Sequence, residues 1–421
     1  MNIFSWISAV SAPHDLWTII INWIHGNALN FGWTILLFTL LVKVITSPLD
    51  FMVKFTTKKQ TLVQQKYSPQ ISKLQKKYGA DQQTLRAQTN ALYKREGVNT
   101  GLGCIVTLVN MILTMVIFFT LYSSLRKVSA YEQINQYEQI ETACYEQTYN
   151  KAKEFDSSIE SLEAFKAWDK AYYNAKQYVE KEGVNTTTEE YAKNNQIVTE
   201  GQALYKYLNE TVSAELNLTL AKTAKAKWNE VKESWLWIDN IWVADANTRP
   251  LPDYAGFVNN AKSGGYEWYV KENISERSYS NIHGLVFSST NPENVPIRAQ
   301  NGYYILAIMA GVLTFLSQWI SELHTKLKNK KANQVAKGAN PMNGGTLKLM
   351  KFILPAIMIM FTLTTGSGFG IYIISSSLAS IVIGELTTLI VDALTKKQRL
   401  EVEEELEKEA NRLIRKGKLQ G

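Results

Sequence analysis

GWTILLFTLLVKVITSPL, residues 32–49, is the stretch that decides how this chain folds. It is long enough to cross a bilayer as a helix, because about 20 apolar residues suffice. Lys43 lies in the middle of the stretch, where a charge costs about 2.5–3.5 kcal/mol on insertion scales. A charge at that depth indicates a polar cavity inside the membrane. The sequence therefore raises the question of which cavity Lys43 serves.

Further apolar stretches have the composition of membrane spans. The mean hydropathy of −0.16 hides them, because it averages them with long polar segments. We therefore predict an all-α polytopic membrane protein with five transmembrane helices, in a bacterial cell membrane. The predicted spans are Phe31–Val53, Leu102–Leu125, Tyr303–Leu323, Phe352–Thr365 and Ile371–Leu394.

The charges between the spans predict the orientation. Residues 54–100 hold ten Lys and Arg against two acids, and residues 322–351 hold seven against one. Residues 126–300 hold 19 Lys and Arg against 25 Asp and Glu. Short basic loops stay in the cytoplasm, so the N-terminus and the acidic insertion are expected outside and the C-terminus inside.

The expected organisation follows from these spans. No cleavable signal is predicted, because the first residues carry no positive charge. The stretch Leu16–Ile24 is too short to span, and it reads as an interfacial helix or as one that packs on the bundle. Within the insertion, residues 126–232 are expected to be helical and 246–300 more irregular. The predicted parts are an outer N-terminal segment (1–30), two spans around a cytoplasmic helical hairpin at 54–100 (31–125), the insertion (126–300), three spans (301–395) and a charged cytoplasmic tail (396–421).

Enzymatic signatures are absent from the sequence. The four histidines are scattered, and there is no phosphate-binding loop, no HExxH and no nucleophile elbow. Cys104 and Cys144 fall on opposite sides of the membrane in this topology, so they cannot pair. We therefore predict a protein that is not an enzyme and that needs no cofactor, metal or small-molecule substrate.

The spans and their borders carry a recognisable pattern. Thr39 and Ser47 lie one helical turn either side of Lys43 and form a polar stripe with it. The other quoted segments are Gln70–Tyr78, Gly101-Leu102-Gly103-Cys104, Trp235-Leu236-Trp237-Ile238-Asp239, Tyr303-Tyr304-Ile305-Leu306, Phe315-Leu316-Ser317-Gln318 and Phe352-Ile353-Leu354-Pro355. In order, spacing and topology these segments resemble the YidC/Oxa/Alb family of membrane protein insertases, over residues 31–125, 235–245 and 303–395. The chain looks like a Gram-positive or related bacterial form of this family.

The resemblance implies a hydrophilic groove that is open to the cytoplasm and to lipid. The groove arginine of the family falls on Lys43, its polar neighbour matches Thr39, and a tyrosine one turn later is Ser47 here. The Gln-x-Pro of the family appears as Asn110-Met111-Ile112, without the proline. Asn110 and Thr114 lie one turn apart and are expected to give a polar face. The resemblance also points to Gln318 and Tyr372 as groove residues. Implied partners are nascent membrane proteins, the Sec translocon, the ribosome and lipids.

Glu385 is a second intramembrane charge. Counted from the outer ends of their helices, Lys43 and Glu385 lie at similar depths, which suggests that they pair in the resting groove. In the alternative interpretation, Glu385 faces the cytoplasmic head groups.

Two other functions remain open from the sequence. One is a transporter of small solutes or ions that uses Lys43 and Glu385 as a relay, although no inverted repeat supports it. The other is a structural membrane protein that acts through its outer insertion.

Overall fold

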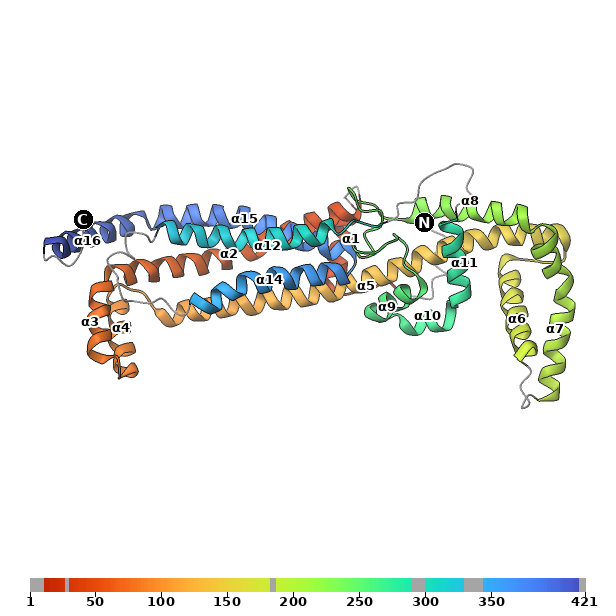
Figure 1. The fold of residues 1–421 in the computed structure, drawn as a ribbon, viewed down its shortest axis with the longest axis horizontal. Coiled ribbons are helices and arrows are strands. Elements are labelled where there is room, and N and C mark those ends of the chain that lie inside the picture. The colour runs from red at the N-terminus through yellow and green to blue at the C-terminus, as the bar shows by residue number, and fades with distance from the viewer. Residues whose placement is uncertain (1–10, 27–29, 182–186, 289–299, 329–343, 416–421) are drawn as a thin grey trace. The chain divides into compact units, whose positions relative to one another are not determined.

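The computed structural model describes residues 11–26, 30–181, 187–288, 300–328 and 344–415. The chain divides into two compact units. The bundle unit comprises His14–Leu125, Ala244–Ala246 and Gly302–Gly421, and the insertion unit comprises Met1–Pro13, Arg126–Val243 and Asn247–Asn301. In the described residues the regular structure is helical, apart from one isolated bridge between Trp235 and Ile238 (Figure 1). The predicted all-α class is confirmed.

Long helices build the bundle unit. In Figure 1 α2, α12 and α15 lie side by side, and α14 runs along the first part of α5. The helices are α1 (Leu16–His25), α2 (Phe31–Lys66), α3 (Ser68–Tyr78), α4 (Gln82–Arg95), α12 (Ile305–Lys328), α14 (Gly344–Thr364), α15 (Ser367–Leu394) and α16 (Lys396–Arg415), and α5 (Thr100–Phe155) begins here and continues in the insertion unit.

Among the described residues, three helices are long and apolar enough to cross a membrane. They are Phe31–Lys66, Gly103–Phe155 and Ser367–Leu394. The described apolar parts of α12 and α14 are shorter, at Ile305–Ile320 and Lys351–Thr364. The chain therefore forms a helical protein with several candidate membrane spans, as predicted.

The helix α2 continues well past its apolar part. It begins after Asn30, whose side chain accepts a hydrogen bond from Trp33 N at 3.2 Å. Pro48 lies inside the helix, and because proline has no N–H it leaves the carbonyl of Val44 without its usual donor. Ser47 Oγ supplies that donor at 2.8 Å. The helix therefore stays continuous to Lys66.

The start of α12 is set by two unusual residues. Tyr303 and Tyr304 have φ angles of 59° and 63°, in the left-handed region, so the helix begins at Ile305 rather than at Tyr303 as predicted. The buried Asp245 accepts a hydrogen bond from Leu306 N at 3.1 Å at this helix start. Burial raises the pKa of the Asp245 carboxyl to about 6.

Small residues let the bundle helices approach each other. A Cβ added to Gly370 of α15 would lie 2.8 Å from Thr362 of α14 and 3.1 Å from Leu306 of α12. The Oγ1 of Thr314 and the Oγ of Ser377 are 3.4 Å apart between α12 and α15. Close packing of this kind holds helices together in lipid, where apolar burial alone gives no driving force.

The polar hairpin formed by α3 and α4 is tied to the end of α2. Glu96 accepts hydrogen bonds from Lys66 Nζ at 2.8 Å and from Tyr67 OH at 2.6 Å. The Lys66 ammonium and the Tyr67 hydroxyl hold the pKa of the Glu96 carboxyl below its usual range. Asp81 caps α4 by accepting a hydrogen bond from Thr84 N at 3.0 Å.

The charged tail folds as α16. Val402 and Leu406 on one face of this helix pack against Leu62 of α2. The remaining described face is charged and exposed. The tail is therefore an amphipathic helix that packs on the last turns of α2.

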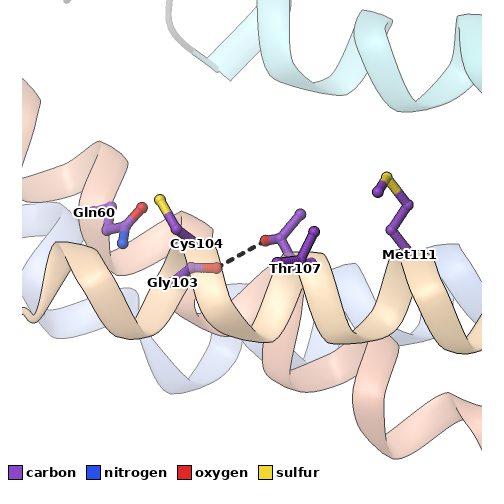
Figure 2. A pocket seen from close by; sticks show the side chains of 6 residues that line it. Gln60, Gly103, Cys104, Thr107 and Met111 are labelled. Carbon is purple, nitrogen blue, oxygen red and sulfur yellow. Dashed lines mark hydrogen bonds between the residues drawn. The ribbon is translucent and has the colours of Figure 1, made fainter.

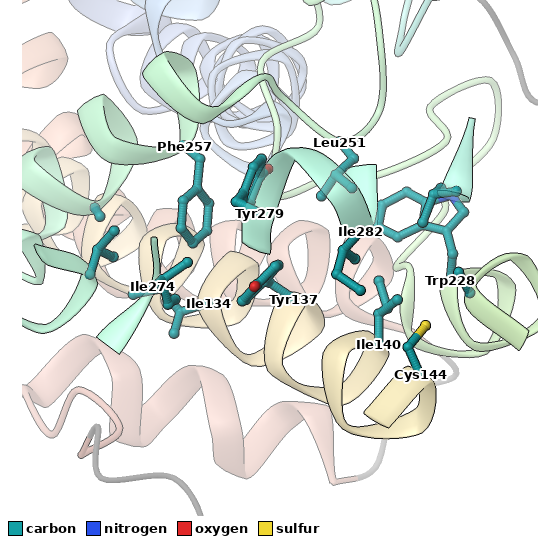
Figure 3. Packing of buried hydrophobic residues seen from close by; sticks show 14 of the residues in the cluster. Ile134, Tyr137, Ile140, Cys144, Trp228, Leu251, Phe257, Ile274, Tyr279 and Ile282 are labelled. Carbon is teal, nitrogen blue, oxygen red and sulfur yellow. The ribbon is translucent and has the colours of Figure 1, made fainter. Parts of the chain in front are cut away.

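The insertion unit has its own apolar core. Figure 3 shows Tyr137 of α5 stacked on Tyr279, with ring centroids 5.1 Å apart, and Phe257 against the same tyrosine at 4.4 Å. Trp228 is fully buried in this cluster. The unit's helices beside α5 are α6 (Leu162–Lys181), α7 (Thr188–Lys206), the π-helix η2 (Tyr207–Thr211), α8 (Ser213–Val231), α9 (Tyr254–Gly264), α10 (Glu267–Asn273) and α11 (Glu276–Val286).

The prediction of an irregular chain over 246–300 is wrong for its described part. Three helices form there, and the Asp, Ser and Gly residues that suggested irregularity lie at their ends. Asp253 caps α9 and Ser275 caps α11, while Gly265 ends α9 with a φ of 86°. The turn-forming composition therefore reflects short helices with frequent caps.

Candidate functional site

The candidate site centres on Lys43, which is half-buried on α2. Asp50 lies two turns further along α2, on nearly the same face, and its carboxylate interacts electrostatically with the Lys43 ammonium. Among the residues that the structure describes, the Lys43 amine has no hydrogen-bond or ion-pair partner. Lys43 is thus a cation held in an apolar helix with only a distant counter-charge.

The two hydroxyls of the predicted stripe are bonded within their own helix. Thr39 is fully buried, and its Oγ1 donates to the carbonyl of Ile35 at 2.6 Å. Ser47 donates to the carbonyl of Val44. Both hydroxyls therefore satisfy backbone groups of α2, and the charged end of Lys43 is the polar group of the stripe that remains available.

Asn110 connects α5 to α2. Its Nδ2 donates to Asp50 Oδ1 at 3.2 Å. Thr114, one turn later, is exposed, and its hydroxyl donates to the Asn110 carbonyl at 2.8 Å. Asn110 and Lys43 are thus brought together through Asp50, a residue that the sequence reasoning missed. Its spacing of seven residues from Lys43 was the signal that could have found it.

Glu385 lies beside a different lysine from the one predicted. Lys54 Nζ donates to the Gly384 carbonyl at 2.6 Å and to Thr388 Oγ1 at 3.1 Å, and it interacts electrostatically with Glu385. Among the described residues, the ion pairs do not include Lys43 with Glu385. Glu385 is level with Lys54, which is eleven residues further along α2 than Lys43.

One more ion pair joins the same two helices. Lys58 Nζ lies 3.1 Å from Asp392 Oδ1, with both side chains less than one-fifth exposed. Lys43, Asp50, Lys54 and Lys58 are here called the charge row of α2. Helical geometry places the four residues within about 80° of the helix surface.

Gln318 and Tyr372 lie elsewhere in the bundle. The Nε2 of Gln318 on α12 is buried with no hydrogen-bond partner among the described residues. Tyr372 on α15 is buried, and its ring packs against Phe369 with centroids 5.7 Å apart. In the described part of the chain neither residue shares a hydrogen bond or ion pair with Lys43.

A pocket of about 330 Å³ opens between α2 and α5, lined by Gln60, Gly103, Cys104, Thr107, Leu108 and Met111 (Figure 2). Gly103 lets the end of the Gln60 side chain lie close to α5, since a Cβ there would lie 2.1 Å from Gln60 Nε2 and the amide would have to move. That amide nitrogen is buried without a hydrogen-bond partner among the described residues. The pocket therefore offers one amide donor in mainly apolar surroundings.

The other end of α5 is closed by ring contacts. Phe118 packs against Phe361 at 5.8 Å and Phe369 at 5.5 Å, and Tyr122 contacts the same two rings. Trp17 of α1 donates to Thr120 at 2.9 Å. This part of α5 is thus packed against α1, α14 and α15, whereas the pocket lies nearer the hairpin.

Most of the described residues in the apolar part of α5 are exposed. Only 6% of its most apolar window is buried, against 28% for α15. The exposed large apolar residues in this part of the helix are Ile105, Leu108, Val109, Met111, Ile112, Met115, Val116 and Phe119.

No metal or redox centre stands out in the described residues. They contain no group of three or more His, Cys, Asp or Glu that could hold an ion. Cys104 and Cys144 are both free thiols, the first exposed and the second buried.

Long apolar helices around a row of charges define a polytopic membrane protein with a polar site inside its bundle. The sequence model of one family, described as "60Kd inner membrane protein", matches residues 23–168. Proteins named "Membrane protein insertase YidC" from Chlorobaculum parvum and Marinobacter nauticus are 32% identical over 107 residues and 31% identical over 123. One of the same name from Aromatoleum aromaticum is 26% identical over 121 residues.

The matches cover 25% of this chain and 18% of the Chlorobaculum protein, and 29% of this chain and 20% or 21% of the other two. The chain thus spans about a fifth of the length of these relatives. No solved structure matches it. The matches make the part of the chain that contains α2, the hairpin and the first part of α5 similar to membrane protein insertases of the YidC/Oxa/Alb family.

Proposed function

We propose that this protein is a membrane protein insertase and chaperone, which inserts integral membrane proteins and helps them fold. Its groove would lie between α2 and α5, open to the cytoplasm and to lipid. The observation that carries the proposal is Lys43, a half-buried cation in an apolar helix without a bonded partner in the described residues. The names of the relatives support the same function.

The proposed topology has five spans with the N-terminus outside and the C-terminus inside. The charge distribution supports it, because the basic segments at 54–100 and 322–351 are short and the long insertion is acidic. In this orientation the ring contacts of Phe118 and Tyr122 close the groove on the outer side. The pocket at Gln60 lies towards the cytoplasm.

The mechanism follows from the cost of moving a polar segment through hydrocarbon. A client's polar flank would wait beside Lys43, Asp50 and Asn110 instead of in lipid. Its acidic groups would be attracted to Lys43 in a medium that screens charge less than water does. The client helix would then leave across the exposed apolar face of α5 into lipid, driven by its own hydrophobicity.

The proposed partners are nascent membrane proteins and lipids, with the Sec translocon and the ribosome on the cytoplasmic side. The basic hairpin of α3 and α4 would serve as the docking platform for arriving chains. The names of the relatives do not favour the transporter interpretation. That interpretation also needs Lys43 and Glu385 to exchange a charge, but Glu385 lies beside Lys54, eleven residues further along α2 than Lys43.

The experiment that tests this function is complementation. Cells depleted of their own insertase are supplied with this chain, and the membrane integration of a single-span reporter is measured. We expect integration to be restored. Lys43→Ala should reduce it about tenfold and Lys43→Arg should retain it, since one lost charge contact of about 1.4 kcal/mol is tenfold.

Lys127→Ala is the matched control, because it removes an exposed lysine in the insertion unit. It should leave integration unchanged. Failure of the native chain to restore integration, at normal levels in the membrane, would overturn the proposed function.

A further inference from the structure

The charge row of α2 divides into two parts that differ in how their charges are met. Lys54 and Lys58 are both bonded to α15, the first through Gly384 and Thr388 and the second through Asp392. These two lysines therefore hold α2 against α15.

The other two residues of the row, Lys43 and Asp50, are not bonded to α15 in this way. Lys43 and Asp50 are seven residues apart, which is about 10 Å along the helix axis. The two side chains interact electrostatically. Among the described residues, however, they do not form an ion pair with an N···O distance within 4 Å. A third group lying between them can therefore reach either charge.

Asp50 is also held differently from the other acids. Its hydrogen bond comes from the neutral amide of Asn110, on the loosely packed helix α5. Lys54 also attracts the Asp50 carboxylate electrostatically, but the hydrogen bonds of its ammonium go to Gly384 and Thr388 of α15. The Asp50 carboxylate can therefore accept a further cationic donor. Asp50 thus faces α5, and Lys43 lies two turns away on nearly the same side of α2.

We propose that Asp50 determines which charges the groove accepts, so that a basic side chain of a client is received at Asp50 as an acidic one is received at Lys43. This inference rests on the proposed insertase function. Without Asp50 the groove would be purely cationic and would repel a basic client segment. With Asp50 it is a neutral pair of opposite charges, which accepts segments of either sign.

The test uses three single-span reporters that differ at one position of the translocated tail, which is Asp, Asn or Lys. Each is expressed in depleted cells with the native chain, Asp50→Asn or Asp50→Glu. We expect Asp50→Asn to lower integration of the Lys reporter about fivefold relative to the Asp reporter, the size typical of one partly exposed charge pair. Asp50→Glu should restore the native ratio, because it keeps the charge.

Glu401→Gln is the matched control, since it neutralises an exposed carboxylate on α16. It should leave the ratio unchanged. The inference would be overturned if Asp50→Asn gave the same ratio of Lys-reporter to Asp-reporter integration as the native chain. This holds whether the integration of all three reporters falls together or does not change. The proposed function fails separately, if the native chain does not integrate the neutral Asn reporter.

Should Asp50→Asn not accumulate, the exchanged variant Lys43→Asp with Asp50→Lys keeps both charges in the gap. It should integrate both charged reporters within about twofold of the native chain, since the pair remains neutral. Loss of the Lys reporter alone in this variant would also overturn the inference.

Discussion

The helices α15 and α5 are both neighbours of α2, but they meet it in opposite ways. α15 is joined to α2 by the bonds of Lys54 and by the Lys58–Asp392 ion pair. α5 meets α2 through the hydrogen bond from Asn110 to Asp50 and the close approach of Gln60 to Gly103. Charged side chains therefore bind the α15 side of α2, whereas the α5 side carries the neutral amide contact to Asp50 and a pocket. A rigid face beside an open one is what a passing client would need.

The largest effect that tests this difference is expected at Lys54. Lys54→Ala removes the hydrogen bonds to Gly384 and Thr388 and the electrostatic attraction between Lys54 and Glu385. Breaking a buried pair from one side costs about 3–5 kcal/mol, and partial exposure puts this one at the lower end. We expect a clear fall in the thermal unfolding midpoint of the purified protein in detergent.

Adding Glu385→Gln to that variant should recover part of the loss, since the stranded charge is then removed as well. A double variant as unstable as Lys54→Ala would show that the charge of Glu385 does not matter. An unchanged midpoint in Lys54→Ala would remove the distinction between the two faces of α2.

A middle-sized effect is expected from a pair of matched isoleucines. Ile373 on α15 is 4% exposed, whereas Ile112 on α5 is 51% exposed. Ile373→Ala should lower the free energy of unfolding by about 2 kcal/mol, near the low end for buried isoleucines because lipid replaces part of the lost apolar contact. Ile112→Ala should stay within about 0.5 kcal/mol. Equal losses, measured by chemical unfolding in detergent, would mean that α5 is packed as firmly as α15.

The helices of the bundle were predictable because long apolar runs and their basic flanks are local features of the sequence. Hydropathy alone found α2, the start of α5 and α15, and the spacing of Thr39 and Ser47 found the stripe. Helix ends were harder, since the left-handed backbone at Tyr303 and Tyr304 comes from tertiary structure.

The partner of Glu385 could not be read from the sequence. The depth comparison assumed that α2 and α15 begin level at one membrane surface, which made Lys43 and Glu385 neighbours. The structure sets Glu385 beside Lys54, about 16 Å further along α2. The relative shift of two packed helices depends on how their surfaces fit, and no single-helix pattern contains that information.

The smallest expected effect is a difference in thiol labelling, which does not require any change in stability. It tests directly whether the α5 side of the pocket is accessible. Cys104 is exposed at the pocket on α5, whereas Cys144 is buried in the core of the insertion unit. A membrane-permeant maleimide should therefore add one label to the native chain, at Cys104, because a thiol reacts only where the reagent reaches it. A third thiol at the buried position of Thr387→Cys on α15 should stay unlabelled, which mass spectrometry of peptides would show. Protection of Cys104 would mean that another element covers the α5 side of the pocket, and labelling at position 387 would mean that the α15 face opens as well.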